Sequence, residues 1–321
     1  MNEIHKNVQT DFAKEVKTGL TSKAKYLASR FIYDAKGDAL FKKIMELPEY
    51  YLTNCEFQII EKFKNHLLDL FNHENGFDLI ELGAGDGKKT KILLEHFVKN
   101  NLNFNYLPID ISGNILDCLE KDLKDALPLL KFKTLKGNYF EILHELNNYN
   151  NRKKVILVLG SNIGNLKEEK AIKFLTEIQK AMDSKDMLFI GFDQKKNPKI
   201  IWDAYNDKEG VTAEFNKNLL HRINVEFEGD FDADNFIHWE SYNPETGTAS
   251  SYLISTIQHS VNIKALDLKV DFKKWETIHT EISQKYDDEM VEDLAKKSGL
   301  SIQFCFQDEK DLYKNYILMK L

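Results

Sequence analysis

The residues best suited to bind a charged ligand lie in a glycine-rich loop, Glu81-Leu82-Gly83-Ala84-Gly85-Asp86-Gly87-Lys88-Lys89-Thr90. A short apolar segment runs into this loop, and a segment with helical spacing of apolar residues follows it. Glycines at such a turn let the backbone turn tightly and approach a ligand closely. The spacing differs from that of dinucleotide and P-loop motifs, and Glu81 suits a ligand with an amino group better than a pyrophosphate. The loop therefore favours S-adenosylmethionine over NAD.

Two further polar positions follow strand-like segments. Asp110 ends segment 105–110, where a carboxylate can accept both hydroxyls of a ribose. Asn138 follows a third strand-like segment, where its amide can hydrogen-bond the amino group of an adenine. The alternative is that Gly83 and Gly85 only make a tight turn and that Asp110 only caps a helix, since isolated glycine motifs are weak signals.

The elements that position these residues alternate between strand-like and helix-like segments from about residue 77 to residue 193, with a helix expected at 115–130 and a third strand at 132–135. The continuous apolar run 155–159 is typical of a central parallel strand covered on both faces. This alternation predicts an α/β fold with a doubly wound, Rossmann-like domain. The flanks mix helices with alternating strands and predict a second, α+β domain. We expect a discontinuous cofactor-binding domain, 55–196 plus 286–321, and a substrate-binding domain, 1–54 plus 197–285.

Composition limits the possible partners. The chain has 321 residues, of which 42% are hydrophobic and 30% are charged, as in globular proteins. With 44 Lys and Arg against 51 Asp and Glu, the net charge of −7 lacks the basic footprint of a general nucleic-acid binder. No apolar run approaches the roughly 20 residues of a membrane span, and residues 1–20 do not resemble a secretion signal. We expect a cytoplasmic monomer with no membrane or nucleic-acid partner.

The three cysteines, Cys55, Cys118 and Cys305, are widely separated and form no CxxC pair. The nine histidines are scattered through the chain. We therefore expect neither a disulfide framework nor a metal site.

Several longer motifs, in order along nearly the whole chain, make the sequence similar to one known family. The chain resembles the histidine-specific Nα-methyltransferases of ergothioneine biosynthesis. The motifs that carry the resemblance, besides the glycine loop, are Tyr33 to Phe41, Leu47 to Thr53, Gly160 to Leu166, Gly210 to Asn218 and Thr280 to Tyr286.

The resemblance implies an S-adenosylmethionine-dependent enzyme that methylates the α-amino group of L-histidine three times to give hercynine. It places Tyr50 beside the reacting nitrogen with Tyr33 nearby, and Asn165 and Tyr205 at the carboxylate and amino end of the substrate. It assigns the imidazole to Glu281 and Ser283. The residues that it implies around the cofactor, with Glu81 added from the loop argument, are Glu81, Gly83, Gly85, Lys89, Asp110, Asn138 and Tyr139.

These assignments make chemical sense. The Asn165 amide can donate to a carboxylate and accept from an amine. Tyrosine faces attract a nitrogen that ends as a quaternary ammonium. Without the resemblance, we would interpret the tyrosines as ordinary core residues and Glu281 as a carboxylate that faces solvent.

Three positions depart from the family pattern. Asn138 stands where the family usually has Asp, and Asn162 where it usually has Thr. Ser251 stands where the family typically has a methionine packed against the imidazole. We expect Ser251 to leave a roomier, more polar pocket and to loosen the preference for histidine.

Three hypotheses remain. The first is histidine Nα-methylation. The second is methylation of another amino acid or of a histidine derivative, motivated by Ser251. The third is a non-enzymatic protein that uses the fold for binding, although the glycine loop and Asn165 are both retained.

Overall fold

A computed structural model describes residues 3–146 and 152–321. The remaining residues, 1–2 and 147–151, fall within the two predicted domains and lie outside the described part. The chain divides into two compact units: residues 1–51 with 196–283, and residues 52–195 with 284–321. The chain therefore passes from one unit to the other three times. The assignment of substrate and cofactor binding to these units remains a proposal.

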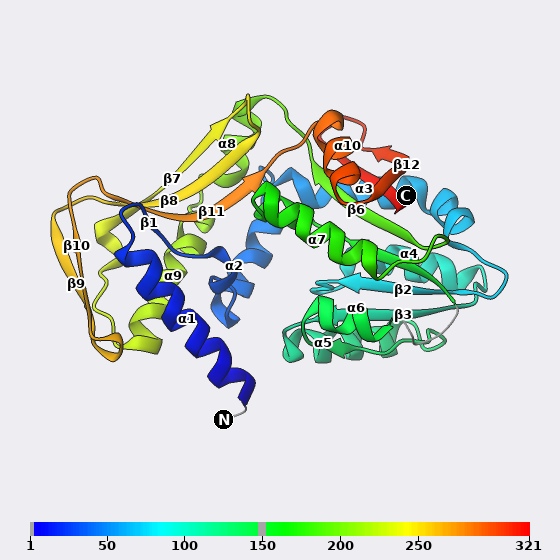
Figure 1. The fold of residues 1–321 in the computed structure, drawn as a ribbon, viewed down its shortest axis with the longest axis horizontal. Coiled ribbons are helices and arrows are strands. Elements are labelled where there is room, and N and C mark those ends of the chain that lie inside the picture. The colour runs from blue at the N-terminus through cyan, green and yellow to red at the C-terminus, as the bar shows by residue number, and fades with distance from the viewer. Residues whose placement is uncertain (1–2, 147–151) are drawn as a thin grey trace. The chain divides into compact units, whose positions relative to one another are not determined.

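The second unit is a doubly wound α/β fold around a seven-stranded sheet, with strand order β12-β13-β6-β5-β2-β3-β4 (Figure 1). Strands β2 to β6 are parallel, and β13 pairs antiparallel with both β6 and β12. The predicted Rossmann-like class is thus confirmed. The strands are β2 (Phe77–Leu82), β3 (Phe104–Asp110), β4 (Leu135–Lys136), β5 (Lys153–Val158), β6 (Met187–Asp193), β12 (Leu300–Gln307) and β13 (Tyr313–Lys320).

Helices cover both faces of this sheet (Figure 1). Apolar side chains of α6, α7 and α10 form one core with alternate residues of β2, β5 and β6. On the other face, aromatic rings of α3 and α4 pack on β2 and β3, as in the Phe71–Phe77 contact. This two-sided burial explains why every residue of β2 and β5 is buried. The helices are α3 (Tyr51–Phe71), α4 (Lys88–Lys99), α5 (Gly113–Ala126), α6 (Tyr139–Leu146), α7 (Glu168–Lys180), α10 (Asp288–Lys297) and the 3-10 turn η2 (Asn162–Asn165).

The first unit is α+β. A four-stranded sheet of order β1-β11-β8-β7 packs against α8 and α9, and β9 pairs with β10 in a small separate sheet. Strand β7 alternates buried and less buried residues, which shows that the packed helices cover only one of its faces. The strands are β1 (Lys25–Tyr26), β7 (Phe236–Asn243), β8 (Thr248–Ser255), β9 (His259–Ile263), β10 (Leu268–Phe272) and β11 (Thr277–Gln284). The helices are α1 (Glu3–Thr21), α2 (Ala35–Glu46), α8 (Pro198–Tyr205) and α9 (Val211–Phe227), with 3-10 turns η1 (Ser29–Phe31), η3 (Ala233–Asn235) and η4 (Lys264–Leu266).

Two predicted elements near the site were placed inaccurately. The third strand, expected at 132–135, is a two-residue strand at Leu135–Lys136, and Phe132 makes only an isolated bridge to Tyr106. The helix expected to reach residue 130 ends at Ala126. Both errors lie in a segment with little apolar periodicity, where element boundaries are hardest to infer.

No helix among the described residues is both long enough and apolar enough to cross a membrane.

Candidate active site

The glycine loop joins the end of β2 to the start of α4. Gly83, Gly85 and Gly87 all have left-handed backbone conformations, with φ of 75°, 55° and 64°. A Cβ on Gly83 would lie 3.0 Å from the Tyr139 hydroxyl, so the loop and Tyr139 approach as closely as a glycine allows. Two of the predicted cofactor residues are therefore neighbours at the carboxyl ends of parallel strands, where doubly wound folds bind their ligands.

Asp110, at the end of β3, connects to the same loop. One carboxylate oxygen accepts from the Gly85 amide at 3.3 Å, and the other accepts from the Ser112 amide at 2.9 Å. The helix cap that follows is Ser112, whose hydroxyl accepts from the Ile115 amide, so Asp110 itself is not the cap of α5. Each carboxylate oxygen keeps a second lone pair with which to accept a ribose hydroxyl.

Glu81 is buried, and its carboxylate is bonded to other side chains of the protein. Its carboxylate is 3% exposed and accepts hydrogen bonds from the hydroxyls of Thr90 and Tyr106. Burial raises the pKa of Glu81 to about 7, against the opposing effect of these hydrogen bonds and of the nearby Lys89 charge. The structure thus gives Glu81 partners within the protein, and its contact with a cofactor amino group stays a prediction.

Lys89 lies against the turn that follows β5. Its ammonium is 2.7 Å from Glu56 Oε2, and a Cβ on Gly160 would lie 3.3 Å from the Lys89 nitrogen. The Glu56 carboxylate also accepts from the Gly160 amide at 2.7 Å. Sequence reasoning missed Glu56. The available signal was its place among Leu52, Ile59 and Ile60 on the apolar side of α3, where a charged residue needs a buried partner.

The other predicted polar residues of this unit differ in exposure. Asn138 is exposed, and its side-chain oxygen accepts from the Phe140 amide at 2.9 Å. That oxygen is the atom predicted to accept from the adenine amino group, so the protein already uses one of its lone pairs. The pKa of Tyr139 is raised to about 12 by burial and by the charge of Asp110, which keeps its hydroxyl neutral. Asn165 is exposed at the end of η2.

In the first unit, an aromatic cluster gathers three of the predicted substrate residues. The ring centroids of Tyr50 and Tyr205 are 6.1 Å apart, and those of Tyr33 and Phe215 are 5.4 Å apart. Phe41 joins the two pairs, at 5.6 Å from Tyr33 and 6.3 Å from Tyr50. The faces of such rings suit a cationic nitrogen.

Asn218 of α9 fixes the turn that carries Tyr33. Its buried amide donates to the Ile32 carbonyl at 3.0 Å and to the Asp34 carboxylate at 2.8 Å. Asp34 in turn caps α2 by accepting from the Gly37 amide at 2.8 Å. A Cβ on Gly37 would lie 1.9 Å from the Ile32 carbonyl, so this turn needs a glycine. The motif residues around Tyr33 therefore set its position through the backbone.

Two polar residues predicted to bind the imidazole, Ser283 and Glu281, lie close to the tyrosines. The hydroxyls of Tyr205 and Ser283 are 2.9 Å apart and share a hydrogen bond. The pKa of Tyr33 is raised well above its ordinary value, first by burial and then by the charges of Glu281 and its other neighbours. The raised pKa shows that the Tyr33 phenol stays neutral and that Glu281 lies near it.

Ser251 was expected to leave a roomier, more polar pocket, but its hydroxyl is already bonded to a buried carboxylate. The residue is 2% exposed, and its hydroxyl donates to Glu240 Oε2 at 2.6 Å. Glu240, also 2% exposed, is its direct partner across β7 and β8. The Ser251 carbonyl accepts from the Thr280 hydroxyl. The proton of Ser251 is therefore already committed, and sequence reasoning missed the carboxylate that takes it.

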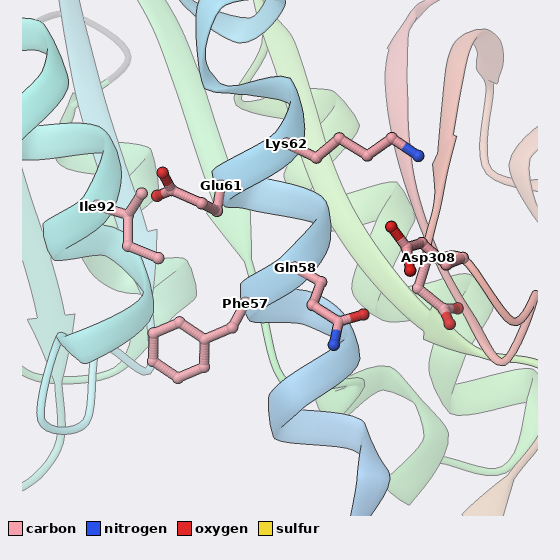
Figure 2. A pocket seen from close by; sticks show the side chains of 7 residues that line it. Phe57, Gln58, Glu61, Lys62, Ile92 and Asp308 are labelled. Atoms are coloured by element: carbon pink, nitrogen blue, oxygen red, sulfur yellow. The ribbon is translucent and has the colours of Figure 1, made fainter.

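A separate surface pocket of about 540 Å³ lies between α3, α4 and the β12–β13 turn (Figure 2). Asp308 accepts from the backbone amides of Lys310, Leu312 and Tyr313, which makes it part of the turn. None of the predicted site residues is among those that line the pocket, which are Phe57, Gln58, Glu61, Lys62, Ile92, Asp308 and Glu309.

Comparison with known proteins agrees with the fold. The strand order and the glycine loop after β2 define a Rossmann-like fold, a class that binds its ligands at the carboxyl ends of the strands. Residues 12–320 match the family model described as histidine-specific methyltransferase, SAM-dependent. The chain therefore belongs to the histidine-specific, S-adenosylmethionine-dependent methyltransferases. Its methyl donor is S-adenosylmethionine.

Three relatives illustrate the range of the similarity. The histidine N-alpha-methyltransferase of Mycolicibacterium smegmatis is 32% identical over 89% of this chain and 88% of its own length. Ergothioneine biosynthesis protein 1 of Schizosaccharomyces pombe is 27% identical over 92% of this chain and 39% of its own length. The 4-dimethylallyltryptophan N-methyltransferase of Aspergillus fumigatus is 24% identical over 91% of this chain and 89% of its own length.

Replacing Asp110 with Ala tests the ribose assignment. The change removes both acceptor oxygens, and we expect binding of S-adenosylhomocysteine, measured by calorimetric titration, to weaken by about 1.5–3 kcal/mol. Ser112→Ala is the matched control, because it removes the cap of α5 but leaves the carboxylate. The control should lose about 1 kcal/mol of stability and keep its affinity. Unchanged affinity in a folded Asp110→Ala protein would contradict the assignment.

Glu81→Gln tests the buried carboxyl through the pH dependence of stability. The Glu81 pKa is about 7 in the folded protein and 4.5 ordinarily, so its contribution is fully present below about pH 4.5 and is lost as the pH rises through 7. The loss amounts to about 3 kcal/mol of unfolding free energy. Urea unfolding between about pH 5 and pH 8 should therefore vary less with pH in Glu81→Gln than in the parent.

Glu61→Gln, which makes the same charge change where the side chain is 58% exposed, should keep the parental pH dependence. Parallel curves for the parent and Glu81→Gln would show that the carboxyl is ionised throughout this range.

Proposed function

We propose that this protein transfers the methyl group of S-adenosylmethionine to the α-amino nitrogen of L-histidine, three times in succession, giving hercynine for ergothioneine synthesis. The observation that carries the choice of substrate is the cluster of Tyr33, Tyr50 and Tyr205 with Glu281 and Ser283 beside it. It combines a surface for a cationic amine with hydrogen-bonding groups for a polar side chain. Membership of the histidine-specific family supports the same substrate.

The cofactor fits the residues of the second unit. A nucleoside needs acceptors for two hydroxyls, which Asp110 offers, and a backbone that it can approach closely, which Gly83 and Gly85 offer. Lys89 supplies a cation for the carboxylate of the amino-acid portion. When bound, S-adenosylmethionine supplies a methyl carbon whose bond to sulfur breaks as the amine lone pair forms the new carbon–nitrogen bond.

The residues of this chain then mainly orient the amine and favour its uncharged form. The rings of Tyr33, Tyr50 and Tyr205 offer aromatic faces to a nitrogen that becomes cationic in each transfer. After the first and second transfers that nitrogen must release a proton to water before it has a lone pair with which to react again. The aromatic faces attract the methylated product without requiring a hydrogen from it, which suits a third transfer that leaves no N–H. Tyr50 is the residue that we place beside the reacting nitrogen, with Tyr33 as its neighbour.

Recognition of the imidazole falls to Glu281 and Ser283. A carboxylate accepts one imidazole N–H, and a hydroxyl can serve the other nitrogen in either role. The Ser283 hydroxyl is hydrogen-bonded to the Tyr205 hydroxyl, so a residue assigned to the imidazole is linked directly to the aromatic cluster. We assign the carboxylate and amino end of the substrate to Asn165 and Tyr205.

A second candidate is methylation of another amino acid or of a histidine derivative by the same chemistry. The observation that favours it is Ser251, bonded to the buried carboxylate of Glu240, where the family pattern has an apolar methionine. One relative is itself named for a tryptophan derivative.

Incubation with S-adenosylmethionine and a panel of free amino acids, read by mass spectrometry, tests the substrate. We expect histidine to gain mono-, di- and trimethylated products and the other amino acids to gain less. Preferred methylation of a different amino acid would replace histidine as the substrate and leave the transferase assignment standing.

Glu281→Ala tests the imidazole contact. A pocket carboxylate left without its N–H partner is costly, which is how Glu281 rejects apolar side chains. The variant should lose kcat/KM for histidine by more than it loses affinity for S-adenosylhomocysteine, and it should discriminate less against phenylalanine. Unchanged histidine turnover would remove Glu281 from the imidazole site.

Ser251→Met, made together with Glu240→Gln, tests the departure from the family. Changing Ser251 alone would remove a donor from a buried carboxylate, so the pair is changed together. We expect discrimination between histidine and phenylalanine to improve by about 1–3 kcal/mol at most. Glu240→Gln alone is the control for the loss of charge.

A further inference from the structure

Glu56 is a wholly buried carboxylate whose two oxygens serve different parts of the second unit. It is 0% exposed. Oε2 accepts from the Lys89 ammonium and the Gly160 amide, each at 2.7 Å. Oε1 accepts from the Tyr313 hydroxyl at 3.0 Å and from the Asn315 amide nitrogen at 2.9 Å. One oxygen therefore faces the candidate cofactor site and the other faces strand β13.

The surrounding residues are arranged around this carboxylate. A Cβ on Gly191 of β6 would lie 2.2 Å from the Tyr313 hydroxyl and 2.4 Å from Glu56 Oε1, so only a glycine leaves room for the cluster. Asn315 is fully buried, and its own Oδ1 has no hydrogen-bond partner within the described structure. The unsatisfied Asn315 oxygen costs free energy of folding. The orientation of the amide that leaves it unsatisfied is the one in which the Asn315 nitrogen donates to Glu56.

The turn that Glu56 holds is strained. Gly160 and Ser161 have φ of 79° and 57°, and a left-handed conformation is uncommon for a serine. Two contacts hold this turn in place: Glu56 accepts from the Gly160 amide, and the Ser161 hydroxyl accepts from the Asp193 amide at 3.0 Å. The turn leads directly into η2, which ends at Asn165.

The same carboxylate holds the Lys89 side chain in one conformation. A lysine side chain is flexible, and fixing it costs conformational entropy, up to roughly 2 kcal/mol. The ion pair with Glu56 meets that cost in the folded protein, because the ammonium is held against Gly160 before any ligand arrives. A ligand carboxylate then meets a cation that is already in place.

We infer that Glu56 is a positioning residue, which holds the Lys89 ammonium and the Gly160–Ser161 turn in the arrangement needed to bind the amino-acid portion of the cofactor. The inference rests on the proposed function for the contact between Lys89 and the cofactor carboxylate, whereas the identity of the cofactor follows from the family. It assigns to α3 a part in cofactor binding that neither the glycine loop nor the family motifs contain.

Glu56→Gln is the informative change because it removes the charge and keeps the shape. The amide oxygen of the new side chain can still accept from Gly160. Its nitrogen can donate to Asn315 once the Asn315 amide flips to present its unsatisfied oxygen. We expect the variant to fold, to release Lys89, and to bind S-adenosylhomocysteine about tenfold more weakly in calorimetric titration.

Tyr313→Phe is the matched control. It removes a donor from Oε1, on the far side of the same carboxylate, and leaves the Oε2 contacts intact. Its affinity for S-adenosylhomocysteine should stay within about twofold of the parent while its melting temperature falls. An equal loss of affinity in Tyr313→Phe and Glu56→Gln would mean that the cluster acts only through general stability, which overturns the inference.

A double-mutant cycle with Lys89→Met decides whether Glu56 acts through Lys89. In the Lys89→Met background, Glu56→Gln should change the affinity by less than about threefold, because no ammonium remains to be positioned. Independent effects that multiply would overturn the inference, as would unchanged or tighter binding in Glu56→Gln alone. If Glu56→Gln does not fold, Glu56→Asp takes its place in the cycle, because it withdraws the carboxylate from Lys89 by one methylene and keeps the buried charge; it should likewise weaken binding in the parent and not in the Lys89→Met background.

The titration also separates this inference from the proposed function. Its readout is the affinity for S-adenosylhomocysteine, which does not depend on the amine that is methylated. A parent protein that binds S-adenosylhomocysteine but does not methylate histidine would leave the role of Glu56 open to the same test. A parent that does not bind S-adenosylhomocysteine would contradict both.

Discussion

A carboxylate without access to water must be satisfied by the protein, and in the second unit that constraint falls on Glu56. Moving an ion into the interior costs several kcal/mol unless partners compensate it. Glu56 meets the condition with one cation and three neutral donors, drawn from α4, the turn after β5, and strand β13. Because these partners are far apart in sequence, the carboxylate can be satisfied only when the whole sheet has assembled. The same contacts fix Lys89 and the turn before η2, so the arrangement of the candidate cofactor site depends on completed folding.

The two units deal with charge in opposite ways. The candidate cofactor site concentrates ionisable groups, Glu56, Glu81, Lys89 and Asp110, and satisfies them with hydrogen bonds. In the aromatic cluster of the first unit the Tyr33 phenol stays neutral, because burial and the nearby Glu281 hold its pKa high. A phenolate there would form an ion pair with an incoming ammonium and hold it protonated, whereas a neutral ring attracts the cation more weakly and so opposes the loss of its proton less. The neutral Tyr33 phenol therefore suits an amine that must react through its lone pair.

The sequence predicted the doubly wound fold because its strong signals are local. The apolar runs of β2 and β5 and the glycine loop after β2 each depend on neighbouring residues. Glu56 and Glu240 were missed because their meaning is not local. Glu56 meets Asn315 across 259 positions, and Glu240 is revealed only by the pairing of β7 with β8. Residues 132–136 were misplaced for a related reason, since so short an edge strand depends on β3 for its pairing.

The pairing of Ser251 with Glu240 shows why one substitution in a family motif cannot be interpreted alone. Read by itself, a serine in place of a methionine opens space and offers a donor to the substrate. In the folded protein the Ser251 hydroxyl donates its proton to Glu240, so Ser251 can offer a substrate only the lone pairs of its oxygen. A substrate group that could use them must itself donate, as an imidazole N–H does and an apolar ring does not. The serine can therefore accept from any side chain that carries a donor, histidine among them, so the departure from the family pattern excludes neither candidate substrate by itself.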